Sequence, residues 1–98
     1  VGEGVSASLF WADGGTRRKV SGDLPEYPAG VQVETQILLE AGVLPDGTVG
    51  RVRPLQKGNA RLEEAALRAV RLWRFEPLRR SAPQREQVCT ITFNFLLR

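Results

Sequence analysis

The strictest constraint in this sequence is a stretch of alternating apolar and polar side chains in the middle of the chain. Six of the seven odd-numbered positions from 31 to 43 are apolar, against two of the seven even-numbered positions from 32 to 44. Successive side chains of a β-strand point to opposite faces, so this period predicts a strand with one face on a core. The fold is therefore expected to contain a sheet that is buried on one side.

A second alternating stretch closes the chain at residues 88–97. One face of the expected strand carries Cys89, Ile91, Phe93, Phe95 and Leu97, and the other carries Val88, Thr90, Thr92, Asn94 and Leu96. The first set predicts the buried face. Cys89 is expected to behave there as a small apolar side chain.

The segments between these two strands predict a return strand and a helix. Pro45, Asp46 and Gly47 are typical of a tight turn, and residues 48–55 read as an antiparallel strand. Pro54 cannot donate to a ladder, which favours an edge position for that strand. Asn59 is a candidate helix N-cap. The apolar stripe of the helix that follows comprises Leu62, Ala65, Ala66, Ala69, Val70 and Trp73.

The N-terminal residues predict a hairpin. Residues 5–11 alternate loosely, Asp13-Gly14 is a strong two-residue turn signal, and residues 16–20 read as a short return strand. We expect an N-terminal β-hairpin extension over residues 1–22 and a domain over residues 23–98. The fold class is α+β, a small antiparallel sheet with one main helix packed on one face.

Composition excludes several classes of function. The chain of 98 residues has no His and one Cys, which removes His or Cys metal clusters, an internal disulfide and His-based catalysis. We therefore predict no catalytic residues, no metal, no cofactor and no enzymatic activity. The net charge of +3 is dispersed along the chain, which is weak evidence for nucleic-acid binding. No apolar run approaches the roughly 18 residues of a membrane helix.

Four motifs in order resemble the C-terminal domain of TonB-family energy transducers. They are PEYP (residues 25–28), VLPDGTV (43–49), LEEAALRAVRLWRFEPL (62–78) and ITFNFLLR (91–98), and together they cover about residues 23–98. The resemblance implies the TonB C-terminal fold. It also implies the periplasm of a Gram-negative bacterium, as the C-terminal domain of a protein anchored in the inner membrane. The chain has no Met, and we expect it to be a piece of a longer protein.

The resemblance also implies a partner and a binding surface. Domains of that family bind the TonB box, an extended peptide of an outer-membrane TonB-dependent receptor, and pass on force from inner-membrane motor proteins. Those motor proteins would engage the N-terminal part that this chain lacks. The expected docking surface is the free edge of the last strand, with Val88, Thr90, Thr92, Asn94 and Leu96, flanked by Glu26, Tyr27 and Pro28.

Several alternatives stay open at this point. The domain could instead be an adaptor of an envelope assembly or motility protein, without a nutrient receptor, or a basic module that binds nucleic acid. The N-terminal hairpin could extend the sheet, swap into a second copy to form a homodimer, or lie along the last strand and occupy the edge that a partner needs.

Overall fold

The computed structural model of the protein describes residues 3–14 and 17–97. Its elements in chain order are β1 (Glu3–Trp11), β2 (Lys19–Ser21), β3 (Thr35–Val43), β4 (Val49–Pro54), α1 (Ala60–Arg71), β5 (Arg74–Phe75) and β6 (Gln87–Leu97). Residues 1–2, at the start of the expected extension over 1–22, lie outside the described residues. So do residue 98, at the end of the expected domain over 23–98, and Thr16 of the expected return strand.

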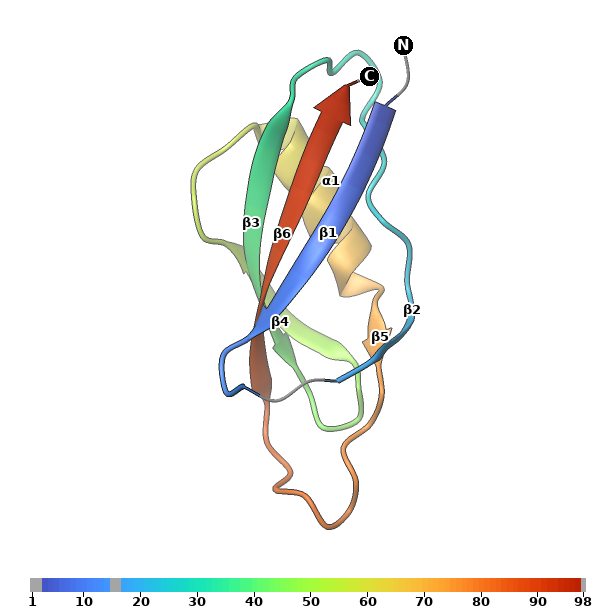
Figure 1. The fold of residues 1–98 in the computed structure, drawn as a ribbon, viewed down its shortest axis with the longest axis vertical. Coiled ribbons are helices and arrows are strands. Elements are labelled where there is room, and N and C mark those ends of the chain that lie inside the picture. Colours follow the sequence, from blue (N-terminus) through green and yellow to red (C-terminus); the bar gives the residue numbers. More distant parts are fainter. Residues whose placement is uncertain (1–2, 15–16, 98) are drawn as a thin grey trace.

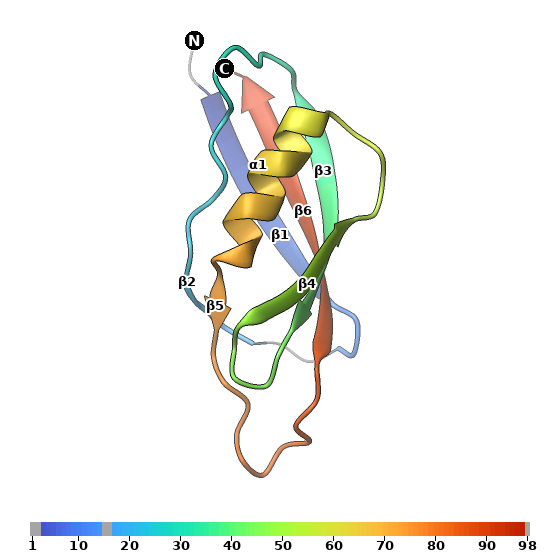
Figure 2. The ribbon, with the colours of Figure 1, turned by 180° about the vertical axis from the view of Figure 1, so that it is seen from behind.

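The molecule is built around one four-stranded antiparallel sheet with the strand order β1-β6-β3-β4 (Figure 1). A second, two-stranded sheet joins β2 to β5. Helix α1 lies across one face of the main sheet, as the view from behind shows (Figure 2). The predicted α+β fold, an antiparallel sheet with one helix on one face, is confirmed.

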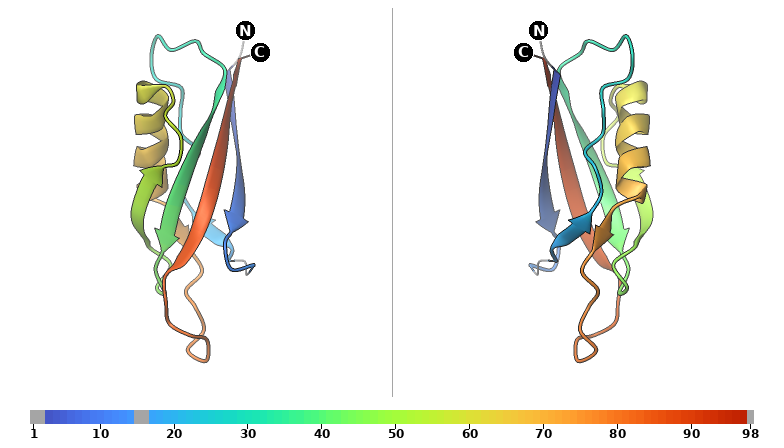
Figure 3. Two further views of the ribbon diagram at one scale, coloured as in Figure 1. Left: turned by 90° about the vertical axis from the view of Figure 1, so that its left-hand side faces the viewer. Right: turned by 90° about the vertical axis from the view of Figure 1, so that its right-hand side faces the viewer.

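The core lies between the sheet and α1, and the opposite face of the sheet has no covering element among the described residues (Figure 3). The alternation read from the sequence places the buried side chains correctly. Cys89, Ile91, Phe93 and Phe95 of β6 are each 0% exposed. On the open face, Phe10 is 70% exposed. The molecule is thus a two-layer structure in which one face of the sheet is buried and the other is open to solvent.

Helix α1 begins where the sequence predicts but ends earlier, at Arg71, whereas the predicted apolar stripe continued to Trp73. The side chain of Asn59 accepts hydrogen bonds from the backbone N–H groups of Arg61 (3.0 Å) and Leu62 (3.1 Å), which caps the first turn. Trp73 follows the last turn and is 0% exposed, and Phe75 in β5 is 2% exposed. Both aromatic side chains complete the core at the end of the helix, as expected.

Strand β3 begins later than the alternation predicts. Residues 31–34 are not in a strand, although Val31 is buried. The N–H of Val31 instead donates to the carbonyl of Pro28 (3.2 Å), in a turn where Gly30 has φ +80°. That turn holds the segment before Thr35 out of the ladder, and the periodicity of the side chains does not reveal it.

Strand β4 is an edge strand, as Pro54 predicts. The N–H of Leu55 donates to the carbonyl of Leu38 (2.9 Å), in the same register that pairs Leu39 with Pro54. Hydrogen-bonded and non-hydrogen-bonded pairs alternate in an antiparallel ladder, so the nitrogen of Pro54 points away from β3. Proline therefore stands where its missing N–H costs the sheet no hydrogen bond.

The N-terminal segment forms a strand, but its pairing differs from the predicted hairpin. The turn is present, since the N–H of Gly14 donates to the carbonyl of Trp11 (3.1 Å). The residues after the turn do not return along β1; β2 pairs with β5, and β1 pairs with β6 over nine residues. The flank of β6 allows a much longer ladder than the few residues after the turn. Those few residues are held away from β1 by Arg17, which donates to the carbonyls of Leu44 and Glu76.

A substitution at Gly47 tests the turn before β4. Gly47 has φ +94°, and a Cβ there would collide with the backbone carbonyl of Phe75. We expect Gly47→Ala to lower the free energy of unfolding by about 2 kcal/mol or more, because strain and a backbone clash combine. The matched control is Gly14→Ala, where φ is +76° but the space is open. Urea denaturation that ranks the two variants equally would contradict the clash.

Candidate functional site

The five residues of β6 that were predicted to bind a partner share one orientation. Their side chains alternate with the buried ones of β6 and so lie on the open face of the sheet: Val88, Thr90, Thr92, Asn94 and Leu96. The N–H of Ala12 donates to the carbonyl of Val88 (3.0 Å) in the same register as the β1–β6 ladder. Since hydrogen-bonded pairs alternate, the even-numbered residues of β6 direct their N–H and C=O groups towards β1. The odd-numbered residues direct theirs towards β3.

The expectation that the last strand lies at a free edge is wrong for this structure. Strand β6 lies between β1 and β3 (Figure 1). Its register with β1 runs from Glu3 opposite Leu97 to Trp11 opposite Cys89. Of the alternatives open from the sequence, the N-terminal segment therefore takes the one in which it lies along the last strand. The flank expected to receive a partner is filled by the chain itself.

The loop residues predicted to flank the docking surface lie on the helix side of the sheet, the face opposite the five even-numbered side chains of β6. The ring of Tyr27 packs edge-on against Phe95 of β6, with ring centroids 5.3 Å apart. The hydroxyl of Tyr27 donates to the carbonyl of Val33 (3.1 Å), which fixes the loop. A shallow hollow is lined by Gly4 and Val5 of β1 and by residues 24–27, among them Glu26. Pro28 ends this loop at the turn before β3.

A second groove was not predicted from the sequence. It lies between residues 23–29 and helix α1, and its lining includes Leu24, Leu72, Arg61 and Arg68. Leu72 is 69% exposed and Leu24 is 45% exposed. Leu72 is a large apolar residue that falls outside the apolar stripe of the helix. Its position is the one signal in the sequence that pointed to this surface.

A buried arginine anchors the chain just after β1, and the sequence does not distinguish it from the other arginines. Arg17 is 8% exposed. Its guanidinium donates to the carbonyls of Glu76 (Nη2, 2.7 Å; Nε, 2.9 Å) and Leu44 (2.9 Å). Burial lowers the pKa of Arg17, partly offset by the carboxylates of Asp46 and Glu76.

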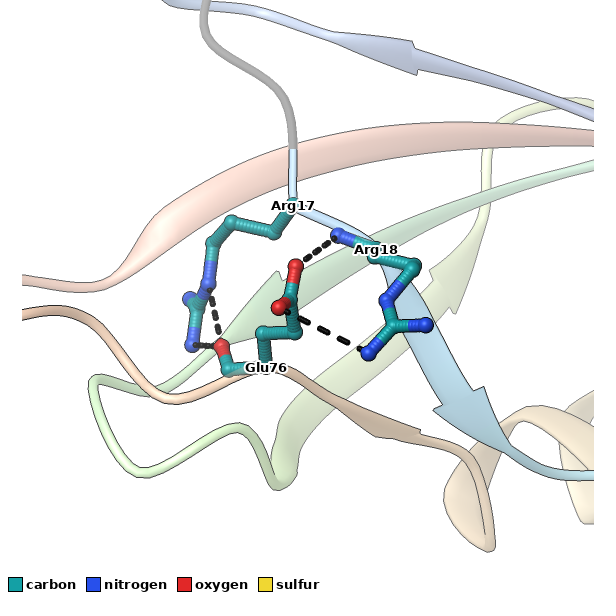
Figure 4. Close-up of polar contacts among 3 residues, drawn as sticks. All are labelled: Arg17, Arg18 and Glu76. Carbon is teal, nitrogen blue, oxygen red and sulfur yellow. Dashed lines mark hydrogen bonds and ion pairs between the residues drawn. The ribbon is translucent and has the colours of Figure 1, made fainter.

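The neighbouring Arg18 contacts Glu76 from the side opposite to Arg17 (Figure 4). Its backbone N–H donates to the carboxylate of Glu76 (3.3 Å), and its guanidinium lies 3.8 Å from that carboxylate. The backbone N–H of Glu76 donates in turn to the carbonyl of Arg18 (2.9 Å). The residues after β1 are therefore tied to β5 independently of the β1–β6 ladder.

The chemistry available at this site is that of main-chain hydrogen bonding. Within residues 3–14 and 17–97 there is no group of three or more His, Cys, Asp or Glu placed to hold a metal ion. In the same part of the chain, no helix has the length and apolar character needed to cross a membrane. The groups that could bind a partner are the main-chain N–H and C=O groups of β6 that now pair with β1, beside the loop that carries Tyr27.

The buried thiol of Cys89 gives a pH-dependent prediction. Burial raises the pKa of Cys89 to about 11 from an ordinary value of 9.0. The thiol is then neutral in the folded state while the unfolded chain ionises, so its contribution is complete below about pH 9 and is lost as the pH rises towards 11. Between pH 7.5 and 10.5 we expect a loss of about 2 kcal/mol.

The matched control is Cys89→Ala, which keeps every other group that titrates in this range. Urea denaturation of both proteins at the two pH values gives the contribution of Cys89 as the difference between their pH dependences. Identical pH dependence of the two proteins would contradict the raised pKa.

The comparison with known families agrees with this architecture. The sequence model described as Gram-negative bacterial TonB protein C-terminal matches residues 24–97. The chain belongs to the TonB C-terminal domain family. A search of curated proteins finds no match to it. TonB C-terminal domains are periplasmic in Gram-negative bacteria, and they act as non-enzymatic interaction domains that generally contact TonB-dependent receptors. Strand β1 of this TonB C-terminal domain lies outside the matched residues.

Proposed function

We propose that this domain binds an extended segment of a TonB-dependent outer-membrane receptor, the TonB box, by β-strand pairing at the β1 flank of β6. In this proposal it passes on force that inner-membrane motor proteins generate, as the periplasmic part of an inner-membrane-anchored protein. The partner-binding residues are those expected from the sequence: Glu26, Tyr27, Pro28, Val88, Thr90, Thr92, Asn94 and Leu96.

One observation carries this proposal. Strand β6 pairs along one flank with a nine-residue segment, β1, that lies outside the residues matched to the family. The family fold therefore has a strand edge that accepts an extended segment, which is the binding mode of β-augmentation. Affinity in this mode comes from main-chain hydrogen bonds, and the side chains of the guest select it more weakly.

The shape of the domain suits a load along the strands. The molecule measures 48 × 23 × 19 Å, and its long axis runs roughly along β1 and β6 (Figure 1). A guest paired with β6 and pulled along that axis loads its hydrogen bonds together in shear. Such a ladder resists force without requiring a large apolar interface.

The test uses receptor peptides and an isotopically labelled domain. Synthetic N-terminal segments of the TonB-dependent receptors from the source bacterium are titrated to about 1 mM, where binding worth about 4 kcal/mol is detected. We expect at least one peptide that contains a TonB box to shift the amide resonances of Thr90, Thr92 and Asn94. A scrambled peptide is the control. If no receptor segment shifts these resonances, in the native protein or in a variant with β1 released, the proposal is overturned.

A further inference from the structure

We propose that β1 is a built-in guest strand, which a receptor segment must displace before it pairs with β6. This inference rests on the proposed function and names its regulation. The strand covers the main-chain groups of Val88, Thr90, Thr92, Asn94 and Leu96, and the flank that it fills is the one a receptor segment requires. In this arrangement the domain exists in a closed state, with β1 paired, and an open state, with the flank of β6 free.

Strand β1 contributes little to the core apart from its last residue. Its inward side chains, Val5, Ala7 and Leu9, are half-buried, whereas the facing residues of β6 are fully buried. Helix α1 crosses the sheet diagonally (Figure 2), and its closest backbone contacts are with β3 and β4. Trp11 is the exception, because it is 7% exposed and packs edge-on against Phe75 at 5.4 Å. What β1 supplies is chiefly a row of hydrogen bonds, which another strand can replace.

The anchor after β1 allows it to separate without unfolding the rest. Arg17 is held by the carbonyls of Glu76 and Leu44, and Arg18 by the carboxylate of Glu76. None of these contacts involves the β1–β6 ladder. The strands β3, β4 and β6 and the helix keep their own pairing and packing when β1 leaves. Local opening of a weakly packed edge strand is cheaper than global unfolding.

The sequence of β1 specifies the chemistry of the guest. From Val5 to Trp11 it carries no charged residue, and its inward positions before Trp11 hold small or aliphatic side chains. Beside it, the loop with Leu24, Glu26 and Tyr27 forms a hollow at Gly4 and Val5. The guest that competes best is therefore an uncharged extended segment with small or aliphatic residues at alternate positions.

Amide hydrogen exchange in the native protein tests the open state with an internal control in one strand. The amides of Thr90, Thr92 and Asn94 are directed towards β1, and those of Ile91 and Phe93 towards β3. Separation of β1 alone exposes the first set and leaves the second protected. We expect the first set to exchange at least about tenfold faster. Equal rates in both sets would show that β1 leaves only with global unfolding, and would overturn the inference.

A pair of proline variants tests the competition. By the register, the N–H of Ser8 faces Thr92 and the N–H of Ala7 faces away from β6. Ser8→Pro therefore removes a ladder bond and releases β1, while Ala7→Pro keeps the ladder and is the matched control. The probe is a labelled peptide of residues 3–11 with two added lysines for solubility. Circular dichroism checks that both variants fold.

We expect this peptide to bind Ser8→Pro at least about tenfold more tightly than it binds Ala7→Pro or the native protein, because the closed state lowers the apparent affinity of any competitor. Equal affinity for all three proteins would overturn the inference. If Ser8→Pro does not fold, the exchange experiment on the native protein still decides.

Receptor peptides separate this inference from the proposed function. A receptor segment that binds Ser8→Pro more tightly than Ala7→Pro supports both. If a segment binds the native protein while Thr90, Thr92 and Asn94 stay slow to exchange, it adds to the outer edge of β1. Receptor binding then stands, but its placement on β6 and the inference are both overturned. If the peptide of residues 3–11 binds Ser8→Pro but no receptor segment does, the inference stands and the function is overturned.

Discussion

Replacing Trp73 by alanine is expected to lower the free energy of unfolding by about 3–5 kcal/mol, the range for a large buried aromatic side chain. Trp73 is 0% exposed and packs against Phe93 and Phe75, with ring centroids 5.7 and 6.3 Å apart. Its indole N–H donates to the carbonyl of Asp23 (2.8 Å), which ties the segment before the Tyr27 loop to the core. The substitution therefore removes packing, and also a hydrogen bond between two distant segments.

Urea denaturation followed by far-ultraviolet circular dichroism measures this loss without depending on tryptophan fluorescence. The control is Leu72→Ala, one residue earlier and 69% exposed, for which we expect a change of about 0.5 kcal/mol or less. A loss of less than about 1 kcal/mol for Trp73→Ala would mean that the ring does not hold the helix end to the sheet.

Replacing Arg17 by methionine is expected to cost about 3 kcal/mol, although the substitution keeps an unbranched apolar stem. The carbonyl of Glu76 accepts hydrogen bonds from both Nε and Nη2 of Arg17, and the carbonyl of Leu44 accepts one from Nη2. Removal of the guanidinium leaves the Glu76 carbonyl without this charged donor in a site that is nearly closed to water. The cost arises from the partners left behind, since a methionine fills the space but donates nothing.

The matched control is Arg18→Met, in the adjacent position. The side chain of Arg18 is 74% exposed and its ion pair with Glu76 is 3.8 Å long, so we expect a loss below about 1 kcal/mol. Thermal and urea denaturation of both variants under one salt condition make the comparison. If the two substitutions cost the same, the burial of Arg17 contributes nothing to stability.

Local patterns predicted the parts of the fold that local physics decides. The alternation in β6 identified its buried face because the side-chain period of a strand is independent of its neighbours. Asn59 marked the start of α1 because an N-cap bonds its own first turn. Pro54 marked an edge because a missing N–H is tolerated only where no strand follows. In each case the residue carries the information by itself.

Pairing between distant segments was not predictable in the same way. The turn at Gly14 was identified, but the turn does not determine whether β1 pairs with the following residues or with a strand at the other end of the chain, as Glu3–Trp11 does with residues 89–97. That choice depends on which partner offers the longer ladder and on where Arg17 becomes buried. Arg17 looks like any other surface arginine until the carbonyls of Glu76 and Leu44 converge on it.

The binding role of the candidate site residues stays a prediction, whereas the pairing of β1 with β6 is seen only in the structure. Tyr27 packs on Phe95 from the helix side of the sheet, whereas the even-numbered side chains of β6 lie on the open face. The sequence could not show that β1 covers the main-chain groups of the same residues, because β1 has no motif that distinguishes a permanent strand from a displaceable one. That distinction lies in burial, which only the packed structure reveals.

The outward-facing nitrogen of Pro54 has a consequence for self-association. Copies of a sheet can grow into an open-ended filament when both edges of each molecule accept a further strand. With Pro54 on the β4 side, that edge lacks a donor that such stacking needs. A two-fold pair that forms through the β1 side keeps a β4 edge at each end, and Pro54 on that edge disfavours the addition of a further strand.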